Sequence, residues 1–416
     1  MSTDRRTFLK AGAALVAGGT SGLAYSEDAL KSSADGLLQR AADGGDVPGV
    51  VAVAVNRDGV IYEGGFGRRN LAEPTAMTPD TVVWIASMTK ALTGTAAMQL
   101  VEQGKLDLDS PVTRWVPDLA RTQVLEGWDE NGEPRLRAPK RAITLRHLLT
   151  HTAGFAYDLW SADLVRYQKL KDIPGIGSCK NIALTTPLLY DPGQRWEYGI
   201  GIDWAGKTVE AISGTRLGNY FKDNIFEPLG MNSSAFKITP DMRRRLAKIH
   251  AHGADGSYKP IEFEMPQEPE FEMGGGGVYS TAGDYAKFVR MILNNGKGNG
   301  NQLLSPQTVA LMSRNAMGNL KVRMLKTQMP ALTNDAEFFP GMPKNWGLTF
   351  MINEETAPTG RTPGSLAWAG LANTYFWIDP NKGVGGVYMT QVLPFADSSA
   401  LPLFYAFEKS VYQSLG

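Results

Sequence analysis

A serine and a lysine lie three residues apart in the stretch from Trp84 to Gly104, WIASMTKALTGTAAMQLVEQG, a spacing suited to nucleophilic catalysis. The residues after the lysine are almost entirely apolar or small, and they predict a helix that begins at Ser87 and ends at Gly104. Residues i and i+3 share one helix face, so Lys90 would point back toward the Ser87 hydroxyl. Burial among apolar neighbours lowers the pKa of a lysine, so Lys90 would then be a base that activates Ser87.

A second Ser-x-x-Lys motif, from Ser234 to Lys237, shows that the pattern alone does not identify a nucleophile. It follows FEPLGMNS in an extended stretch that favours a strand, and no helix begins at its serine. Such a motif carries information only in the right structural setting. Ser87 is therefore the candidate nucleophile.

Two later segments offer further groups for the same chemistry. Tyr198, in PGQRWEYGIGIDWAG, lies at the N-terminus of a predicted helix and is a second candidate for proton transfer. The alternative is that Tyr198 is only an aromatic side chain packed beside Trp196. The run SLAWAGLANTYFW has a strand pattern that contains Trp368, Ala369 and Gly370, and small residues in a strand let its backbone approach a ligand closely.

The order and approximate spacing of these segments resemble a known superfamily. Ser87-Met88-Thr89-Lys90, Tyr198 and Trp368-Ala369-Gly370 are similar to the three active-site boxes of serine β-lactamases and penicillin-binding proteins. The segments LRHLLTHTAG, FEPLGM, GGGGVYST and MTQVLPF also look like that superfamily, and the resemblance covers about residues 30 to 415. The chain most resembles the class C β-lactamase-like carboxylesterases of family VIII, in which Trp-x-Gly stands where β-lactamases carry Lys-Thr-Gly.

The resemblance implies a role for each matching residue. Ser87 would form an acyl-enzyme, and Lys90 and Tyr198 would share the transfer of its proton, with the leading base left open. The backbone N–H groups of Ser87 and Leu371 would form the oxyanion hole, and water would release the acyl group. The residues expected to contact substrate are Trp368, Ala369, Gly370 and Tyr157.

Two departures from the superfamily pattern bear on the substrate. The second box of β-lactamases ends in asparagine two residues after the tyrosine or serine, where this chain has Ile200. The third box has Trp368 in place of a lysine that helps to bind the carboxylate of penicillins and cephalosporins. Both changes favour neutral esters over β-lactams.

The resemblance therefore implies a serine carboxylesterase that hydrolyses short-chain esters, with weak β-lactam hydrolysis as a side activity. The implied partner is a small-molecule ester, and no cofactor is implied. A β-lactamase or D,D-peptidase is one alternative, against which the missing lysine of the third box argues. An acyltransferase that passes the acyl group to an alcohol is compatible with the same motifs. A non-catalytic penicillin sensor is disfavoured because Ser87, Lys90 and Tyr198 are all present.

The composition excludes some classes of partner. The 416 residues include 42 basic and 42 acidic side chains, and 43% of the chain is hydrophobic. This balance, with no long run of one charge, does not favour nucleic acid or an anionic membrane surface. No segment after residue 26 approaches a membrane span.

The first 26 residues predict a twin-arginine export signal. Arg5 and Arg6 precede the Gly/Ala-rich stretch AGAALVAGGTSGLAYS, and cleavage is expected near Ala24 or Ser26. The apolar part from Ala11 to Ala24 is too short and too rich in glycine to span the roughly 30 Å of a bilayer core. The mature protein is therefore expected to be periplasmic or secreted.

Residues 27–416 predict a single catalytic domain of the α/β class (α+β type). Strand patterns occur near both ends of the chain, in VPGVVAVAVNRDGVIYEGGFG, WGLTFMIN, SLAWAGLANTYFWID and GVGGVYMTQVL. Helical patterns fill the middle, including ITLRHLLTHTAGF and GIGIDWAGKTVEAISG. We expect an antiparallel sheet from residues 27–85 and 275–416, flanked by helices, with a mostly helical subdomain inserted over residues 86–274. This is the layout of the serine β-lactamase-like fold.

The remaining motifs favour structural roles. His147 and His151 have the i,i+4 spacing of helical metal ligands, but the glutamate of His-Glu-x-x-His is missing, so no metal site is predicted. Gly274 to Gly277 lack the Gly-Lys-Ser/Thr continuation of a phosphate loop and are expected to let a strand pass close to the acyl pocket. Cys179 is the single cysteine and is expected to be incidental. Arg361, just before the third box, is expected at the rim of the pocket.

Overall fold

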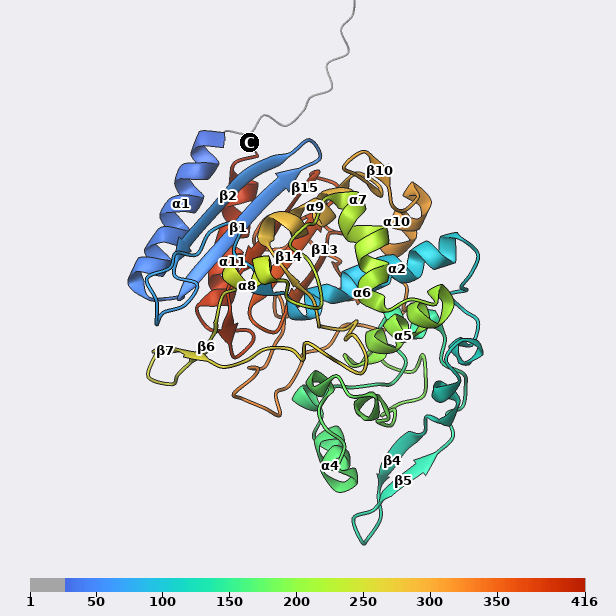
Figure 1. Ribbon diagram of the computed structural model, residues 1–416. Helices are drawn as coiled ribbons and strands as arrows, with labels where there is room; N and C mark the ends of the chain where they lie inside the picture. The colour runs from blue at the N-terminus through green and yellow to red at the C-terminus, as the bar shows by residue number, and fades with distance from the viewer. Residues whose placement is uncertain (1–26, 416) are drawn as a thin grey trace, which may run out of the picture.

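The computed structural model describes residues 27–415, which are built around a seven-stranded antiparallel sheet. The strands lie in the order β11-β12-β13-β14-β15-β1-β2, so the N-terminal hairpin pairs with the last strand of the C-terminal series (Figure 1). Their bounds are β1 Gly49–Asn56, β2 Val60–Gly67, β11 Lys344–Trp346, β12 Met351–Asn353, β13 Leu366–Gly370, β14 Thr374–Asp379 and β15 Val384–Met389. The predicted sheet made from both ends of the chain is confirmed.

The β1–β2 hairpin follows from its turn chemistry. The side-chain oxygen of Asn56 accepts hydrogen bonds from the backbone N–H groups of Asp58 and Gly59, at 2.9 and 2.8 Å, which closes the turn. Strand β1 is buried along nearly its whole length. Its continuous run of alanine and valine fits a strand that is covered on both faces.

Helices cover both faces of the sheet. Helices α1 (Glu27–Gly44) and α11 (Ala400–Gln413) pack against each other on one side, and α9 (Ala282–Leu293) packs against β1, β14 and β15 (Figure 1). Successive side chains of a strand point to opposite faces. In β14 the ring of Tyr375 therefore stacks on Phe404 of α11, while its neighbour Phe376 contacts Tyr285 of α9.

Residues 86–274 hold most of the remaining helices. Helix α2 packs against α5, and the hairpin β4–β5 lies beside α4 at the end of the molecule away from α1 (Figure 1). A second small sheet, in the order β16-β6-β7, joins this part to the C-terminal region. The bounds are α2 Thr89–Glu102, α3 Leu145–Leu149, α4 Ala162–Lys171, α5 Gly201–Ser213, α6 Leu217–Phe221, α7 Glu227–Leu229, α8 Pro240–Arg244, β4 Val124–Trp128, β5 Pro134–Arg137, β6 Ile249–His252, β7 Tyr258–Ile261 and β16 Val392–Leu393. Outside this part, α10 spans Pro306–Met312, and the short pairs β3 (Val83–Trp84) with β8 (Tyr279–Ser280) and β9 (Lys297–Gly298) with β10 (Asn301–Gln302) complete the α-helices and strands of the described residues.

Several predicted elements differ from the observed ones, and WGLTFMIN, predicted as one strand, contains the end of β11 and all of β12, with Thr349 between them at a φ of 80°. The helix predicted through Gly154 ends at Leu149, and His151 has a positive φ of 56°, which a helix does not allow. The strand predicted over residues 365–379 is two strands, β13 and β14. They are separated by a turn in which Asn373 has a φ of 56°.

The predicted export signal, residues 1–26, lies outside the described residues. Within residues 27–415, no helix combines the length and the apolar character needed to cross a membrane.

Candidate active site

Ser87 lies on a short turn of 3₁₀ helix, Ala86–Met88, that joins β3 to α2. The preceding residue, Ala86, has a positive φ of 45°, which is uncommon for a residue with a Cβ and is found where the surroundings hold the backbone in place. Here the hydroxyl of Tyr285 donates to the carbonyl of Met88 at 2.9 Å. Ala86 and Met88 are buried while Ser87 is partly exposed, so the turn presents the Ser87 side chain at the surface of the site.

Lys90 faces Ser87 from the first turn of α2. Its Nζ donates to Ser87 Oγ at 3.0 Å and to the carbonyl oxygen of Gly275 at 2.5 Å, and the side chain is fully buried. Burial lowers the pKa of Lys90, and the nearby carboxyl of Asp203 partly opposes this shift. A larger share of Lys90 is therefore in the neutral form that can accept a proton.

Tyr198 lies next to both residues. Trp368 Nε1 donates to the Tyr198 hydroxyl oxygen at 2.9 Å, and Lys90 Nζ lies 4.8 Å from the centroid of the Tyr198 ring. Burial raises the pKa of Tyr198, while hydrogen bonding to the side chains of Ser87 and Trp368 works in the opposite direction. The three predicted boxes thus meet at one point, although they are far apart in the sequence.

Aromatic rings enclose the site around Tyr198. The rings of Tyr157 and Trp160 lie 5.3 and 5.4 Å from the Tyr198 ring, and Trp346 lies 4.6 Å from Trp368. Tyr157 is buried, and its ring centroid is 5.1 Å from Lys90 Nζ. The aromatic neighbours give Lys90 an apolar environment with few competing hydrogen-bond partners.

The end of β13 lies against the turn that carries Ser87. A Cβ added at Gly370 would lie 2.2 Å from the carbonyl oxygen of Ile85, so this approach requires glycine. Leu371 follows directly, and its backbone N–H stands at the end of the same strand. Ala369 and Trp368 are buried in β13.

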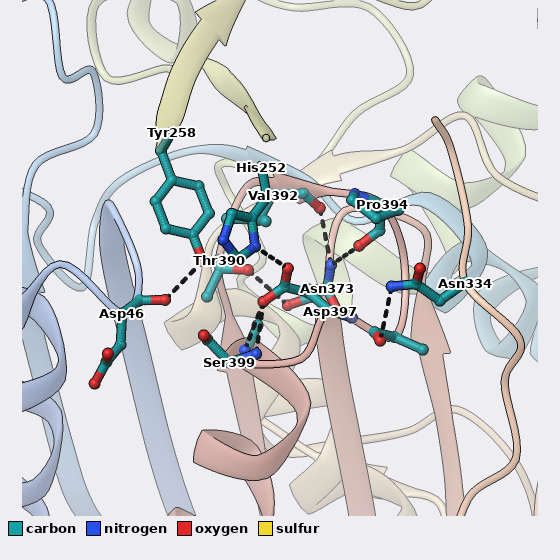
Figure 2. Close-up of polar contacts among 12 residues, drawn as sticks. Asp46, His252, Tyr258, Asn334, Asn373, Thr390, Val392, Pro394, Asp397 and Ser399 are labelled. Carbon is teal, nitrogen blue, oxygen red and sulfur yellow. Dashed lines mark hydrogen bonds and ion pairs between the residues drawn. The ribbon is translucent and has the colours of Figure 1, made fainter. Parts of the chain in front are cut away.

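A network of polar side chains holds the turn after Leu371. Asn373 Nδ2 donates to the carbonyl oxygens of Val392 and Pro394, at 2.9 and 2.8 Å, and Thr390 Oγ1 donates to the Asn373 carbonyl at 3.0 Å (Figure 2). Asp397 extends the network.

Asp397 connects this turn to two other elements. Its backbone N–H donates to Asn373 Oδ1, and its carboxylate contacts His252 Nδ1 and accepts from the N–H of Ser399 at the start of α11 (Figure 2). The turn that follows Leu371 is therefore held by residues that come from β6, the β15–β16 region and the start of α11.

Asp203 is a further buried ionisable residue of the site, which the motif analysis missed. It lies in the first turn of α5 and is fully buried, and its Oδ1 accepts from the Gly275 N–H at 2.8 Å. The carbonyl of the same Gly275 accepts from Lys90. An aspartate inside the otherwise apolar GIGIDWAG was the available signal, because a buried carboxyl needs a partner.

The other candidate residues lie elsewhere or have structural roles. The side chain of His147 bonds the backbone N–H of Thr144 in the N-terminal cap of α3, and residues 27–415 contain no cluster of three potential metal ligands. The prediction that Arg361 lies at the pocket rim is wrong. Arg361 is 2% exposed, and its Nε and Nη2 each lie 2.6 Å from a carboxylate oxygen of the fully buried Glu408.

A cavity of about 320 Å³ lies beside the aromatic rings of the site. The rings of Trp160 and Trp196 both line this cavity and contact the Tyr198 ring, at 5.4 and 6.3 Å between centroids. Its charged lining residues are Arg195, Glu197, Arg323 and Lys326.

Comparison with known proteins gives matches along nearly the whole described chain. A family model described as Beta-lactamase matches residues 34–407. The monacolin J acid methylbutanoyltransferase of Aspergillus terreus is 35% identical over 396 residues, which cover 90% of this chain and 94% of that protein. The lovastatin esterase of Penicillium rubens is 31% identical over 396 residues, which cover 91% of this chain and 98% of that protein. The solved structure of EstCE1, described as a hydrolase with promiscuous acyltransferase activity, has a TM-score of 0.72 and 25% identity, and covers 93% of this chain and 99% of its own.

Proposed function

The chain belongs to the beta-lactamase family, and from this membership we propose that it is a serine carboxylesterase that acts on short-chain esters. The predicted membership in the superfamily of serine β-lactamases and penicillin-binding proteins is confirmed. Because its relatives include both an acyltransferase and an esterase, it is an acyl-transferring serine enzyme. The ester preference and the residue roles below are our proposal.

The observation that carries the proposal is the 3.0 Å contact between Lys90 Nζ and Ser87 Oγ. In the first step Ser87 Oγ attacks the ester carbonyl carbon while its proton passes to Lys90, either directly or through the Tyr198 hydroxyl, which gives its own proton to Lys90 as it accepts the other. A nucleophile and a base within hydrogen-bond distance are the requirement for this step. The lowered pKa of Lys90 supports it as the acceptor, since burial disfavours its charged form.

Two backbone N–H groups would stabilise the negative oxygen of the tetrahedral intermediate. Those of Ser87 and Leu371 are suited to this role, because the close approach at Gly370 brings the end of β13 against the Ser87 turn. Such donors typically contribute about 10²- to 10³-fold to kcat. The leaving alcohol then takes the proton from Lys90 or Tyr198, and a water molecule repeats the sequence to release the acid.

The third box supports an ester substrate over a β-lactam. Trp368 stands where β-lactamases have a lysine, and its N–H is already bonded to the Tyr198 hydroxyl. A neutral indole in this position offers an anionic substrate no charge to pair with. We therefore expect cephalosporins to be poor substrates.

A second candidate function is transfer of the acyl group to an alcohol other than water. It is supported by the 35% identity to a methylbutanoyltransferase along 90% of the chain. Adding an alcohol to the ester assay separates the two functions. A transferase should form more of the new ester, relative to the free acid, than the molar ratio of alcohol to water predicts.

The test of the main proposal compares the wild-type protein with Ser87→Ala on p-nitrophenyl butyrate, with a chromogenic cephalosporin in parallel. We expect steady ester turnover that falls by about 10³-fold or more in Ser87→Ala. The matched control is Ser234→Ala, in the second Ser-x-x-Lys motif, which should keep its turnover. Full activity of Ser87→Ala would overturn the proposal. A cephalosporin burst without ester turnover would indicate a penicillin-binding protein.

For residues 1–26 we propose export by the twin-arginine route to the periplasm or beyond. Support comes from the paired arginines ahead of the apolar stretch. The double change Arg5→Lys and Arg6→Lys should leave the precursor in the cytoplasm, as fractionation of the producing cells would show. Unchanged export would contradict this proposal.

A further inference from the structure

Asp203 is a buried carboxyl group beside the proposed base, and the superfamily motifs do not account for it. Resting on the proposed acyl transfer at Ser87, we propose that Asp203 is a positioning residue that stabilises Lys90 in its protonated form, because the Gly275 backbone holds its carboxyl group close by. Asp203 does not touch the reacting atoms, so it acts through Lys90.

The contacts form a continuous chain. Asp203 Oδ1 accepts from the Gly275 N–H at 2.8 Å, and the Gly275 carbonyl accepts from Lys90 Nζ at 2.5 Å. The two contacts lie on either side of the Gly275 Cα, so they hold the carboxyl group close to the ammonium group without a bond between them. At this short range the charge of Asp203 acts through space and favours a positive charge on Lys90.

The residue between them has to be glycine. A Cβ added at Gly275 would lie 2.6 Å from Asp203 Oδ2 and 2.9 Å from the Tyr157 hydroxyl oxygen. Any side chain there would push the carboxyl group away from the backbone. One glycine of the run Gly274 to Gly277 is thus explained by the approach of Asp203.

The negative charge of Asp203 matters because proton transfer creates a positive charge on Lys90. When Ser87 Oγ bonds to the substrate carbon, the hydroxyl proton moves to Lys90 Nζ, and a fully buried ammonium group results. Such a charge is unfavourable unless an opposite charge lies near it. The proton then leaves with the alcohol, so Lys90 returns to the neutral amine and Asp203 is unchanged.

The other ionisable groups around Lys90 do not supply this charge. Burial lowers the pKa of His151 far enough to keep it neutral, and burial raises the pKa values of Tyr157 and Tyr198 and keeps both protonated. Cys179 and Asp158 face Asp203 and Tyr157 respectively, and burial raises their pKa values too. Burial also raises the pKa of Asp203, but the Lys90 charge and the hydrogen bond from the Gly275 N–H favour its ionised form.

This arrangement also explains the departure at the second box. The position that holds asparagine in β-lactamases is Ile200, which has no polar group to offer Lys90. Asp203 follows one helical turn later, at the start of α5, and reaches Lys90 by way of Gly275.

The test is Asp203→Asn, which keeps an oxygen acceptor for the Gly275 N–H but removes the charge. The pKa of Lys90 should fall, so the acid limb of kcat/KM for p-nitrophenyl butyrate should move to lower pH by about one unit or more. Because a base with a lower pKa accepts a proton less readily, the plateau should fall by about tenfold or more. The matched control is Asp379→Asn, an equally buried aspartate at the far end of β14, which should lose stability without moving the limb.

A wild-type acid limb and plateau in a folded Asp203→Asn protein would overturn the proposal. If that variant does not fold, Asp203→Ser carries the same test, because serine is smaller and keeps an acceptor oxygen. Failure of this inference is separable from failure of the proposed function. Loss of activity in Ser87→Ala with an unmoved limb in Asp203→Asn contradicts only the role of Asp203.

Discussion

The indole N–H of Trp368 donates a hydrogen bond to the hydroxyl oxygen of Tyr198, with 2.9 Å between the two atoms. The sequence predicts that Trp368 contacts the substrate, and the structure adds a polar contact from the same side chain to Tyr198. This bond favours the ionised form of Tyr198, whose pKa burial raises. Trp368 therefore both shapes the site and positions the Tyr198 hydroxyl.

Trp368→Phe removes this donor and keeps an aromatic ring. We expect kcat for an ester to fall by about 3- to 10-fold, the usual effect of one lost hydrogen bond. The control is Trp377→Phe, since the Trp377 indole N–H is buried without a hydrogen-bond partner on the opposite side of the sheet from α9. Equal losses of kcat in both variants would argue against a specific role for the Trp368 N–H.

The Ser87–Lys90 contact could be predicted from the sequence because it depends on local geometry. Residues three apart on a helix face one another whatever the rest of the chain does. The hairpin at Arg57 to Gly59 was predictable for the same reason, since its turn residues hydrogen-bond to their own backbone.

The contacts that the sequence did not reveal connect distant segments. The bond from Lys90 to Gly275 spans 185 positions, and no periodic pattern encodes it. Arg361 was misplaced because its partner Glu408 lies 47 positions later, on a helix whose inward face depends on the packing of the sheet. The sequence predicts a helix that runs through His151 to a stop at Gly154, but the backbone turns after Leu149.

The buried position of Lys90 predicts the pH dependence of the reaction. Burial lowers its pKa below the ordinary lysine value near 10.4, and the neutral amine is the active form. Activity should therefore rise with pH through an acid limb that lies well below that value, and should be lost as the pH falls through it. The measurement is kcat/KM for p-nitrophenyl butyrate between pH 5 and 10, corrected for spontaneous hydrolysis, in steps of about half a unit.

Lys90→Arg tests the role of Lys90 as the base. Arginine keeps the positive charge and cannot lose its proton, so activity should fall by about 10²- to 10⁴-fold across the whole pH range. Lys237→Arg, in the second Ser-x-x-Lys motif, is the matched control because Lys237 is exposed and pairs with Glu268. A Lys90→Arg protein with a wild-type profile would show that Lys90 is not the base.

The buried ion pair between Arg361 and Glu408 predicts a large effect on stability. Glu408→Gln leaves the buried guanidinium without its counter-charge and should lower the free energy of unfolding by about 3–5 kcal/mol. The double variant Arg361→Met with Glu408→Leu should lose less, because neither charge remains buried. Urea denaturation followed by fluorescence measures both. A greater loss in the double variant than in Glu408→Gln would contradict this account.

Asn373 holds the turn that carries Leu371, and its removal tests the proposed oxyanion hole. Asn373→Ala deletes the donor bonds to Val392 and Pro394 and the acceptor of the Asp397 N–H (Figure 2). The Leu371 N–H would then be held less firmly, and we expect kcat to fall by about tenfold, less than the 10²- to 10³-fold loss of a whole oxyanion donor.

The loss in Asn373→Ala should appear in kcat and not in KM. A donor that acts on the developing negative charge contributes mainly to the transition state, so KM should change little while kcat falls. Asn381→Ala is the control, since Asn381 makes similar side-chain bonds at the opposite end of β14, to Thr362 and Pro363. If Asn373→Ala raised KM and left kcat unchanged, the turn would position substrate rather than the oxyanion donor, and Leu371 would lose its proposed role.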